Sequence, residues 1–211
     1  LDLDAIGNRY LLVRISTFTR ACAILETALV GVIGILLKIA KFDLEKFFRK
    51  HAKQHAHLHQ SGRLTHEGFG TDGRVNFGEC NAPDNTGRVS NELTLFVRHE
   101  LRRLQREYAP RDPALRAWLA RRAALSNSES AEFTLDVLFF VWWYVDDAGL
   151  AIIDDPLFDH RGEPIFVLLD DGVTRVHQGR AQLFIEAAIG VIMYVGHKAP
   201  LDKRDGPGRA L

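Results

Sequence analysis

The spacing of apolar residues along the chain predicts several helices. Between Leu93 and Leu104, apolar residues recur at three- and four-residue steps, the period of a helix with one buried side. A strongly apolar segment near the C-terminus is followed by Gly196, a residue type that often ends helices. The predicted helices are residues 83–107, 113–125 and 181–195, with helical composition also at 45–55 and, in part, at 11–37.

Short apolar runs between turn residues predict strands. One run ends at Asp43, and another leads into Asp146-Asp147, after which apolar residues resume. Asp170-Asp171-Gly172 lies at the turn of a later hairpin. The predicted strands are residues 39–44, 133–145, 148–153, 164–169 and 173–176, with one further hairpin within 63–77. These elements indicate an α+β fold of antiparallel strands backed by helices on one face.

Charge is balanced overall but unevenly distributed. The chain has 27 Lys and Arg against 27 Asp and Glu, so its net charge is zero. Residues 97–125 are rich in arginine, whereas residues 129–171 are rich in aspartate. This pattern suits an enzyme that holds a phosphate backbone beside bound metal ions, and it equally fits a solvated helix beside an acidic hairpin. On α-helical spacing, we expect Arg98, Arg102 and Arg106 to share one helix face.

Other features limit the class of protein. The two cysteines, Cys22 and Cys80, form no metal-binding or disulfide pattern, so we expect an intracellular protein. The most apolar run, 27–37, is too short to cross a membrane, which predicts no membrane partner. Four histidines lie close together, and we weigh a metal site against the polar end of a helix. They are His51, His55, His57 and His59.

Three aspartates are candidates for metal-dependent phosphoryl transfer. That chemistry needs carboxylates from separate strands brought close together around two ions. A strand that ends at Asp43 and a turn at Asp146-Asp147 supply such carboxylates. An Asp-Asp pair alone is usually only a turn. The turn at Asp170-Asp171 is the rival location for the acidic pair.

Four blocks, in order, resemble those of reverse transcriptases. Tyr144-Val145-Asp146-Asp147 resembles the YxDD box, and the segment Lys41–Phe48 resembles the block with the first carboxylate. Val75–Pro83 resembles the segment that enters the long helix of the palm. Gly196–Lys203 resembles a later block with glycine and lysine at a seven-residue offset. The resemblance covers residues 38–211 and leaves 1–37 unassigned, with part of the fingers as one interpretation.

The resemblance implies a role for each matching residue. Asp43, Asp146 and Asp147 would be catalytic and bind two Mg²⁺ ions, with Mn²⁺ as a substitute. Lys203 would donate a proton to pyrophosphate. Phe48 would exclude the ribose 2′-hydroxyl. Contacts with nucleotide, primer or template would come from Lys46, Phe47, Tyr144, Phe77, Gly78, Ala82 and Pro83, and contacts with the nucleic-acid backbone from Arg98, Arg102 and Arg106.

The expected protein is therefore the palm of an RNA-directed DNA polymerase of a retroelement. The resemblance implies a ferredoxin-like antiparallel sheet, a template with primer as partner, and deoxynucleoside triphosphates as substrates. We expect the thumb and part of the fingers to lie outside this chain, so that it could be inactive alone. Two alternatives stay open, a non-catalytic nucleic-acid-binding remnant and an RNA-synthesising polymerase. Phe48 argues against the second.

Overall fold

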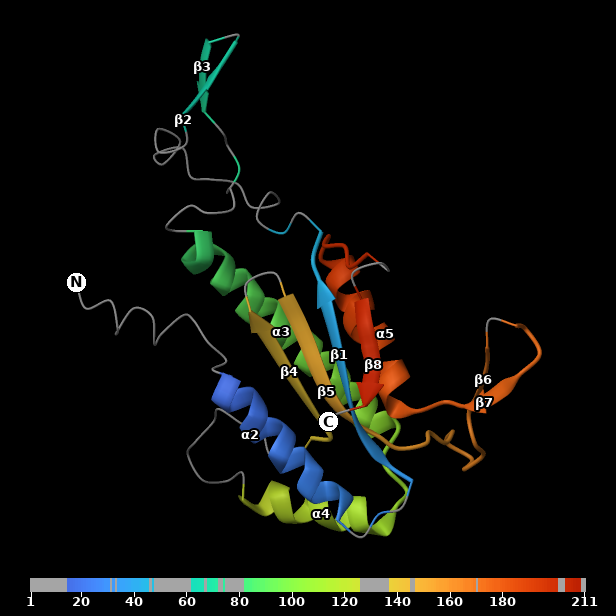
Figure 1. Ribbon diagram of the computed structural model, residues 1–211. Coiled ribbons are helices and arrows are strands. Elements are labelled where there is room, and N and C mark those ends of the chain that lie inside the picture. The colour runs from blue at the N-terminus through green and yellow to red at the C-terminus, as the bar shows by residue number, and fades with distance from the viewer. Residues whose placement is uncertain are drawn as a thin grey trace.

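One four-stranded antiparallel sheet forms the centre of the protein, and helices pack on it (Figure 1). The computed structural model describes residues 15–30, 32, 34–45, 47, 62–66, 68–71, 74, 82–125, 137–144, 147–169, 171–200 and 204–209. Helices and antiparallel strands together confirm the predicted α+β class.

The sheet has the order β4-β5-β1-β8. Its strands are β4 (Phe139–Tyr144), β5 (Asp147–Asp154), β1 (Leu36–Asp43) and β8 (Arg204–Arg209). β1 pairs with β5 over its full length, from Leu36 opposite Asp154 to Asp43 opposite Asp147. β8 pairs with the other edge of β1, with an irregularity between Ile39 and Lys41. β1 is thus an interior strand, and the predicted strand at 39–44 is confirmed with an earlier start.

Helices α3 (Ala82–Glu107) and α5 (Arg180–Tyr194) cover one face of the sheet, which we call the α3/α5 face. Side chains at alternate strand positions, such as Phe42, Leu150 and Val141, pack there against Leu101 and Phe184. The segments predicted at 83–107 and 181–195 are both confirmed as helices. They form because each presents an apolar stripe to the sheet, whose burial supplies most of a helix's stability.

Helices α2 (Ile15–Glu26) and α4 (Pro113–Leu125) cover part of the opposite face, which we call the α2/α4 face. Leu37, Ile153 and Phe140, from three strands, pack there against Leu25 and Leu115. The expectation of helices on one face only was wrong. Apolar residues occupy both sets of alternate positions along the strands, so both faces of the sheet must be covered by other elements. Through α2, residues 15–26 belong to the same packed unit as the sheet.

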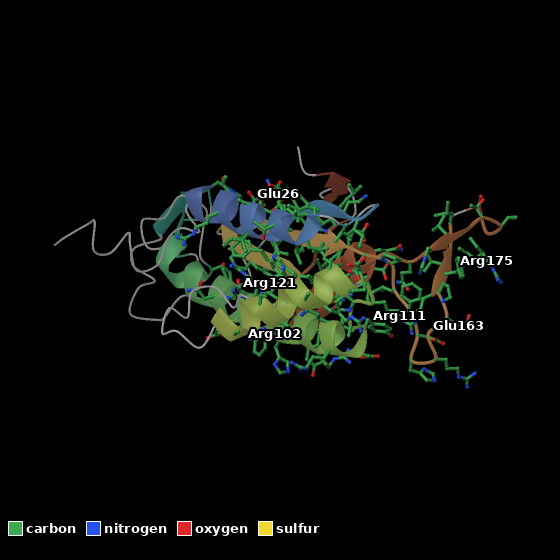
Figure 2. All side chains as sticks on the ribbon, turned by 90° about the horizontal axis from the view of Figure 1, so that it is seen from below. Glu26, Arg102, Arg111, Arg121, Glu163 and Arg175 are labelled. Carbon is green, nitrogen blue, oxygen red and sulfur yellow. The ribbon has the colours of Figure 1, made fainter. Side chains whose placement is uncertain are left out.

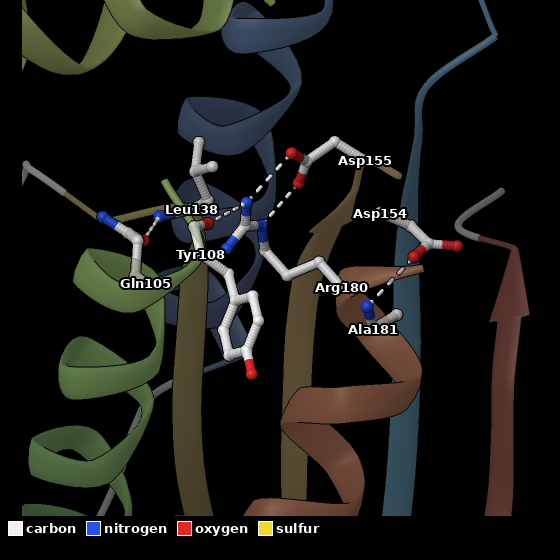
Figure 3. Close-up of polar contacts among 7 residues, drawn as sticks. All are labelled: Gln105, Tyr108, Leu138, Asp154, Asp155, Arg180 and Ala181. Atoms are coloured by element: carbon white, nitrogen blue, oxygen red, sulfur yellow. Dashed lines mark hydrogen bonds and ion pairs between the residues drawn. The ribbon is translucent and has the colours of Figure 1, made fainter. Parts of the chain in front are cut away.

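A buried ion pair joins α5 to the far end of β5 (Figure 3). The guanidinium of Arg180 binds the carboxylate of Asp155 through two nitrogens, and Nη2 lies 2.9 Å from Oδ2. Nη2 also donates to the carbonyl oxygen of Tyr108 at the end of α3, at 2.8 Å. Next to this pair, Asp154 accepts a hydrogen bond from the backbone N–H of Ala181 in the first turn of α5. One arginine therefore connects three elements.

Two small hairpins lie outside the sheet. β2 (Gly62–Thr65) and β3 (Gly68–Thr71) pair antiparallel, which confirms the hairpin predicted within 63–77. β6 (Phe166–Leu168) and β7 (Arg175–His177) form the later predicted hairpin, which projects from the body of the protein (Figure 1). Among the described helices, none combines the length and apolar character needed to cross a bilayer.

Candidate active site at the end of the central sheet

The strand register brings two of the predicted metal ligands together. Asp43 is the last residue of β1 and Asp147 the first of β5, and the two are cross-strand partners. On the other side of β5, Tyr144 is the partner of Asp147. Directly opposed residues in an antiparallel pair have Cβ atoms about 4.5–5.5 Å apart. The three positions thus form one row across the end of the sheet, which we call the carboxylate row.

Both aspartates lie on the α2/α4 face. In β1, Leu37 and Ile39 pack on that face, and in β5 so do Ala151 and Ile153. Since side chains alternate between faces with a period of two, Asp43 and Asp147 share this face with them. Their immediate neighbours Phe42 and Ala148 point into the opposite core. The two carboxylates therefore lie side by side rather than on opposite faces.

The α2/α4 face changes from apolar to polar along β1. Leu37, near the start of β1, is 3% exposed. Lys41 lies four residues further along the same face, next to the carboxylate row, and its side chain is 53% exposed. The ammonium of Lys41 lies 3.2 Å from Oδ1 of Asp147, whose side chain is 37% exposed. A solvent-accessible polar patch therefore follows the apolar cover of α2 and α4. The position of Lys41 on this face could have been predicted from sequence, since Lys41 precedes Asp43 by two residues on one strand and must share its face.

Trp142 and Gly149 lie beside this polar patch and pack closely against each other. They are cross-strand partners in the row that also contains Lys41. A Cβ added at Gly149 would lie 1.8 Å from the indole carbon Cζ2 of Trp142. The indole therefore lies directly over the backbone of residue 149. A glycine inside a strand often marks such a close approach.

The turn that follows Asp43 is anchored to the loop after α5. Phe47 is 1% exposed, and its ring centroid lies 5.3 Å from that of the buried His197. The backbone N–H of Glu45 donates to the carbonyl oxygen of Lys198 at 2.8 Å. The block around residue 196 thus contacts the block around Asp43, although some 150 residues separate them along the chain.

Gly196 directs this loop into place. Its φ of 90° is the left-handed conformation that glycine adopts easily. Its N–H donates to the carbonyl of Met193, and the N–H of His197 donates to the carbonyl of Ile192. These two bonds form a Schellman motif, which ends α5 where the sequence predicted. The chain then turns so that His197 enters the core beneath Phe47.

The rival acidic turn lies elsewhere. It belongs to the β6–β7 hairpin, which follows β5 in the chain. β5 begins at Asp147 and ends at Asp154, and at 3.3 Å per residue these two ends are roughly 23 Å apart. Asp171 accepts hydrogen bonds from the N–H groups of Val173 and Thr174 and from the hydroxyl of Thr174. The Thr174 hydroxyl, followed by these backbone bonds, holds the pKa of Asp171 below its usual value. Asp171 therefore organises its own turn, and Asp43 pairs with Asp147 instead.

The predicted arginines lie on α3, behind the sheet. Arg98 and Arg102 are half-buried and Arg106 is exposed, so the stripe turns from the flank of α3 towards solvent. Burial, with the neighbouring charge of Arg102 as the second cause, lowers the pKa of Arg98. In Figure 2, Arg102 lies on the helical body, whereas Arg175 lies out on the β6–β7 hairpin. Since α3 covers the α3/α5 face, these arginines do not adjoin the carboxylate row on the opposite face.

The start of α3 nevertheless lies at the end of the sheet that carries the carboxylate row. The other end of α3 is placed by Gln105, whose side chain accepts a hydrogen bond from the N–H of Leu138, just before β4 begins. α3 therefore runs back along the sheet, and its first residues, Ala82 and Pro83, lie towards the end of β4 that meets β5 at Asp147 (Figure 1).

Several predicted site residues lie outside the part of the chain that the structure describes. For Tyr144, Ala82 and Pro83 the described part is the backbone. The residues outside are Asp146, Lys46, Phe48, Phe77, Gly78, Lys203 and the histidines His51, His55, His57 and His59. Their roles stay predictions.

The donor set of the carboxylate row suits Mg²⁺ or Mn²⁺. Carboxylate oxygens are the hard ligands that these ions prefer, and Mg²⁺ is commonly bound by one or two carboxylates together with water and substrate phosphate. Asp43 and Asp147 supply two such groups, and the chain between β4 and β5 contains Asp146. Among the described residues, no three His, Cys, Asp or Glu side chains cluster tightly enough to enclose an ion by themselves.

Comparison with known proteins gives no independent assignment, because no family model matches the chain and a search of curated proteins found no relative.

Proposed function

We propose that this chain is the catalytic palm of an RNA-directed DNA polymerase, which extends a primer on a template with deoxynucleoside triphosphates. The observation that carries the proposal is the strand register of Asp43 with Asp147 at the end of an antiparallel sheet. Two-metal phosphoryl transfer needs carboxylates brought close together around the ions, and this register supports such an arrangement. The blocks that resemble reverse transcriptases were identified from sequence, and two that are distant along the chain meet at Phe47 and His197.

In this proposal Asp43, Asp146 and Asp147 would hold two Mg²⁺ ions. When bound, the ions would favour ionisation of the primer 3′-hydroxyl and neutralise charge on the triphosphate. The 3′-oxygen forms a bond to the α-phosphorus while the bond from that phosphorus to pyrophosphate breaks. The hydroxyl proton leaves to solvent, and Lys203 donates a proton to pyrophosphate. Phe48, the residue after Phe47 in the sequence, would select deoxyribose by excluding a 2′-hydroxyl.

Primer extension tests this proposal. With Mg²⁺, an RNA template and an annealed DNA primer, Asp43→Asn and Asp147→Asn should each reduce the extension rate by about 100-fold or more. Substitution of residues that only hydrogen-bond to a metal's ligands already lowers metal affinity or activity by about 10–100-fold. Mg²⁺-dependent binding of a deoxynucleoside triphosphate should weaken in the same variants. That second measurement applies even if this chain needs further domains for extension.

Asp171→Asn is the matched control, because it makes the same chemical change in the rival acidic turn. It should retain activity and nucleotide binding. Loss of activity in Asp171→Asn, with Asp147→Asn unaffected, would move the site to the β6–β7 hairpin. A wild-type chain that binds template and primer but neither extends the primer nor binds nucleotide with Mg²⁺ would be the non-catalytic remnant instead.

A further inference from the structure

Lys41 is a charged neighbour of the carboxylate row to which the resemblance to reverse transcriptases assigns no role. It lies on β1 two residues before Asp43, on the same face of the sheet. Its ammonium is 3.2 Å from Oδ1 of Asp147, the carboxylate that belongs to the neighbouring strand. A lysine side chain is a compact charge on a flexible stem, so it can reach this position and also leave it.

We propose that Lys41 is a built-in counter-ion, which holds Asp147 in the metal-free protein and is displaced when a divalent ion binds. The inference rests on the proposed function, because it assumes that Asp147 is a metal ligand. Asp43 and Asp147 are like charges held side by side by the strand register, and they repel each other. The Lys41 ammonium reduces that repulsion while no ion is present.

The geometry favours an exchangeable contact over a structural one. The two side chains are 53% and 37% exposed, and an ion pair of that exposure contributes little to stability. The buried pair of Arg180 and Asp155 differs, since both of its side chains are at most 3% exposed. Lys41 can therefore move into solvent at small cost, whereas Arg180 cannot.

Displacement has a measurable consequence for metal affinity. A divalent ion that binds Asp147 must break the contact with Lys41 and tolerate a positive charge nearby. Removing that charge should therefore tighten binding. Because an exposed pair of this kind contributes modestly, we expect Lys41→Met to lower the dissociation constant for Mn²⁺ about two- to fivefold.

The experiment titrates Mn²⁺ alone into the 211-residue chain and follows the loss of free-ion signal by electron paramagnetic resonance. Lys41→Arg keeps the charge and should stay within about twofold of the wild type. Lys38→Met is the matched control, since Lys38 is on the same strand but three residues away, and so on the opposite face. It should leave the Mn²⁺ affinity unchanged.

A double variant isolates the contact itself. In an Asp147→Asn background, Lys41→Met should have much less effect on the residual Mn²⁺ affinity, because the pair is already broken. If the wild type binds Mn²⁺ through Asp43 and Asp147 but Lys41→Met binds equally or more weakly, the counter-ion role is wrong and the proposed function stands. If the wild type does not bind Mn²⁺, or Asp43→Asn and Asp147→Asn leave binding intact, the metal site fails and both proposals fail with it.

Discussion

At the scale of single residues, the packing beside the carboxylate row depends on the lack of a side chain at Gly149. The indole of Trp142 lies over Gly149, in space that a Cβ would occupy. Trp142 packs at the edge of the apolar layer on the α2/α4 face, and the next row of the sheet contains Asp147. One glycine thus lets a large ring lie close to the sheet where the apolar layer ends.

We predict that Gly149→Ala destabilises the protein by about 1–3 kcal/mol, the usual cost of forcing extra atoms into a packed position. The added methyl group must push the Trp142 ring away or shift the strand. Urea unfolding followed by circular dichroism measures the change.

Gly190→Ala provides the control for this prediction. Gly190 lies within α5, and beyond its chain neighbours and the adjacent backbone of its own helix no atom lies within 4 Å of the position that its Cβ would take. This substitution should be neutral or stabilise the protein by about 0.5–1 kcal/mol, because alanine favours helices. Equal stability of Gly149→Ala and the wild type would show that the indole does not occupy the space over residue 149.

At the scale of elements, α3 presents different surfaces to the sheet and to solvent. Its apolar side, with Val97 and Leu101, packs in the core of the α3/α5 face. Arg98, Arg102 and Arg106 follow the flank and outer side. Since the carboxylate row lies on the opposite face, any nucleic acid that contacts this stripe would do so at a distance from the row.

We predict that replacing Arg98, Arg102 and Arg106 together by glutamine weakens binding to a template with primer and reduces its salt dependence. If each contacts one phosphate, the slope of log affinity against log salt should fall by about 0.9 per arginine on a duplex. Filter binding over a range of salt concentrations measures the slope.

Arg103→Gln is the control on the same helix, because Arg103 is held by Glu100 and Glu107 through hydrogen bonds of 2.7–2.9 Å. It should change the salt slope little. An unchanged slope in the triple variant would assign the stripe to the solvated surface of α3 and leave nucleic-acid binding to other residues.

Local sequence patterns predicted most elements but not how they assemble. The helix at 113–125 and the strand that ends at Asp43 follow from composition and periodicity, which depend on nearby residues. The order of the strands, and the cover of both faces, depend on contacts between distant segments. Leu115 and Trp118, three residues apart, share one side of this helix, yet nothing local says which face of the sheet they cover. β8 was missed because its sequence, Arg-Asp-Gly-Pro-Gly-Arg, is unlike that of most strands.

In the candidate site, too, local patterns predicted residues but not the contacts between distant segments. Asp43 and Asp147 were predicted from motifs, and their pairing follows once the register is known. The contact of Lys41 with Asp147 was not predicted, because it joins two strands whose pairing the sequence alone does not fix. The pair of Arg180 and Asp155 was missed for the same reason.

At the scale of the whole molecule, Arg180 joins the two helices of the α3/α5 face to the sheet. It binds Asp155 just after β5 and the carbonyl of Tyr108 just after α3 (Figure 3). Both charged side chains are almost completely buried. Buried pairs of this kind hold elements in one arrangement, although they need not stabilise the fold more than apolar residues would.

We predict that Asp155→Leu alone destabilises the protein by about 3–5 kcal/mol, because it leaves the charge of Arg180 buried without its partner. The double variant Asp155→Leu with Arg180→Met should recover most of that loss, since it buries no charge. Urea unfolding of both single variants and the double variant measures the coupling. Additive losses in the double variant would mean that the two residues act independently.

The interior position of β1 also affects how the chain behaves while it is being synthesised. β1 is complete at residue 43, but its partners β5 and β8 begin only at residues 147 and 204. About 100 residues must leave the ribosome before the first partner arrives, and closing so long a loop costs conformational entropy. Until then, β1 has two unpaired edges, the kind of surface that associates with other chains. A product truncated before β5 would therefore retain the first carboxylate on a strand prone to aggregation, and chaperones are most needed at this stage.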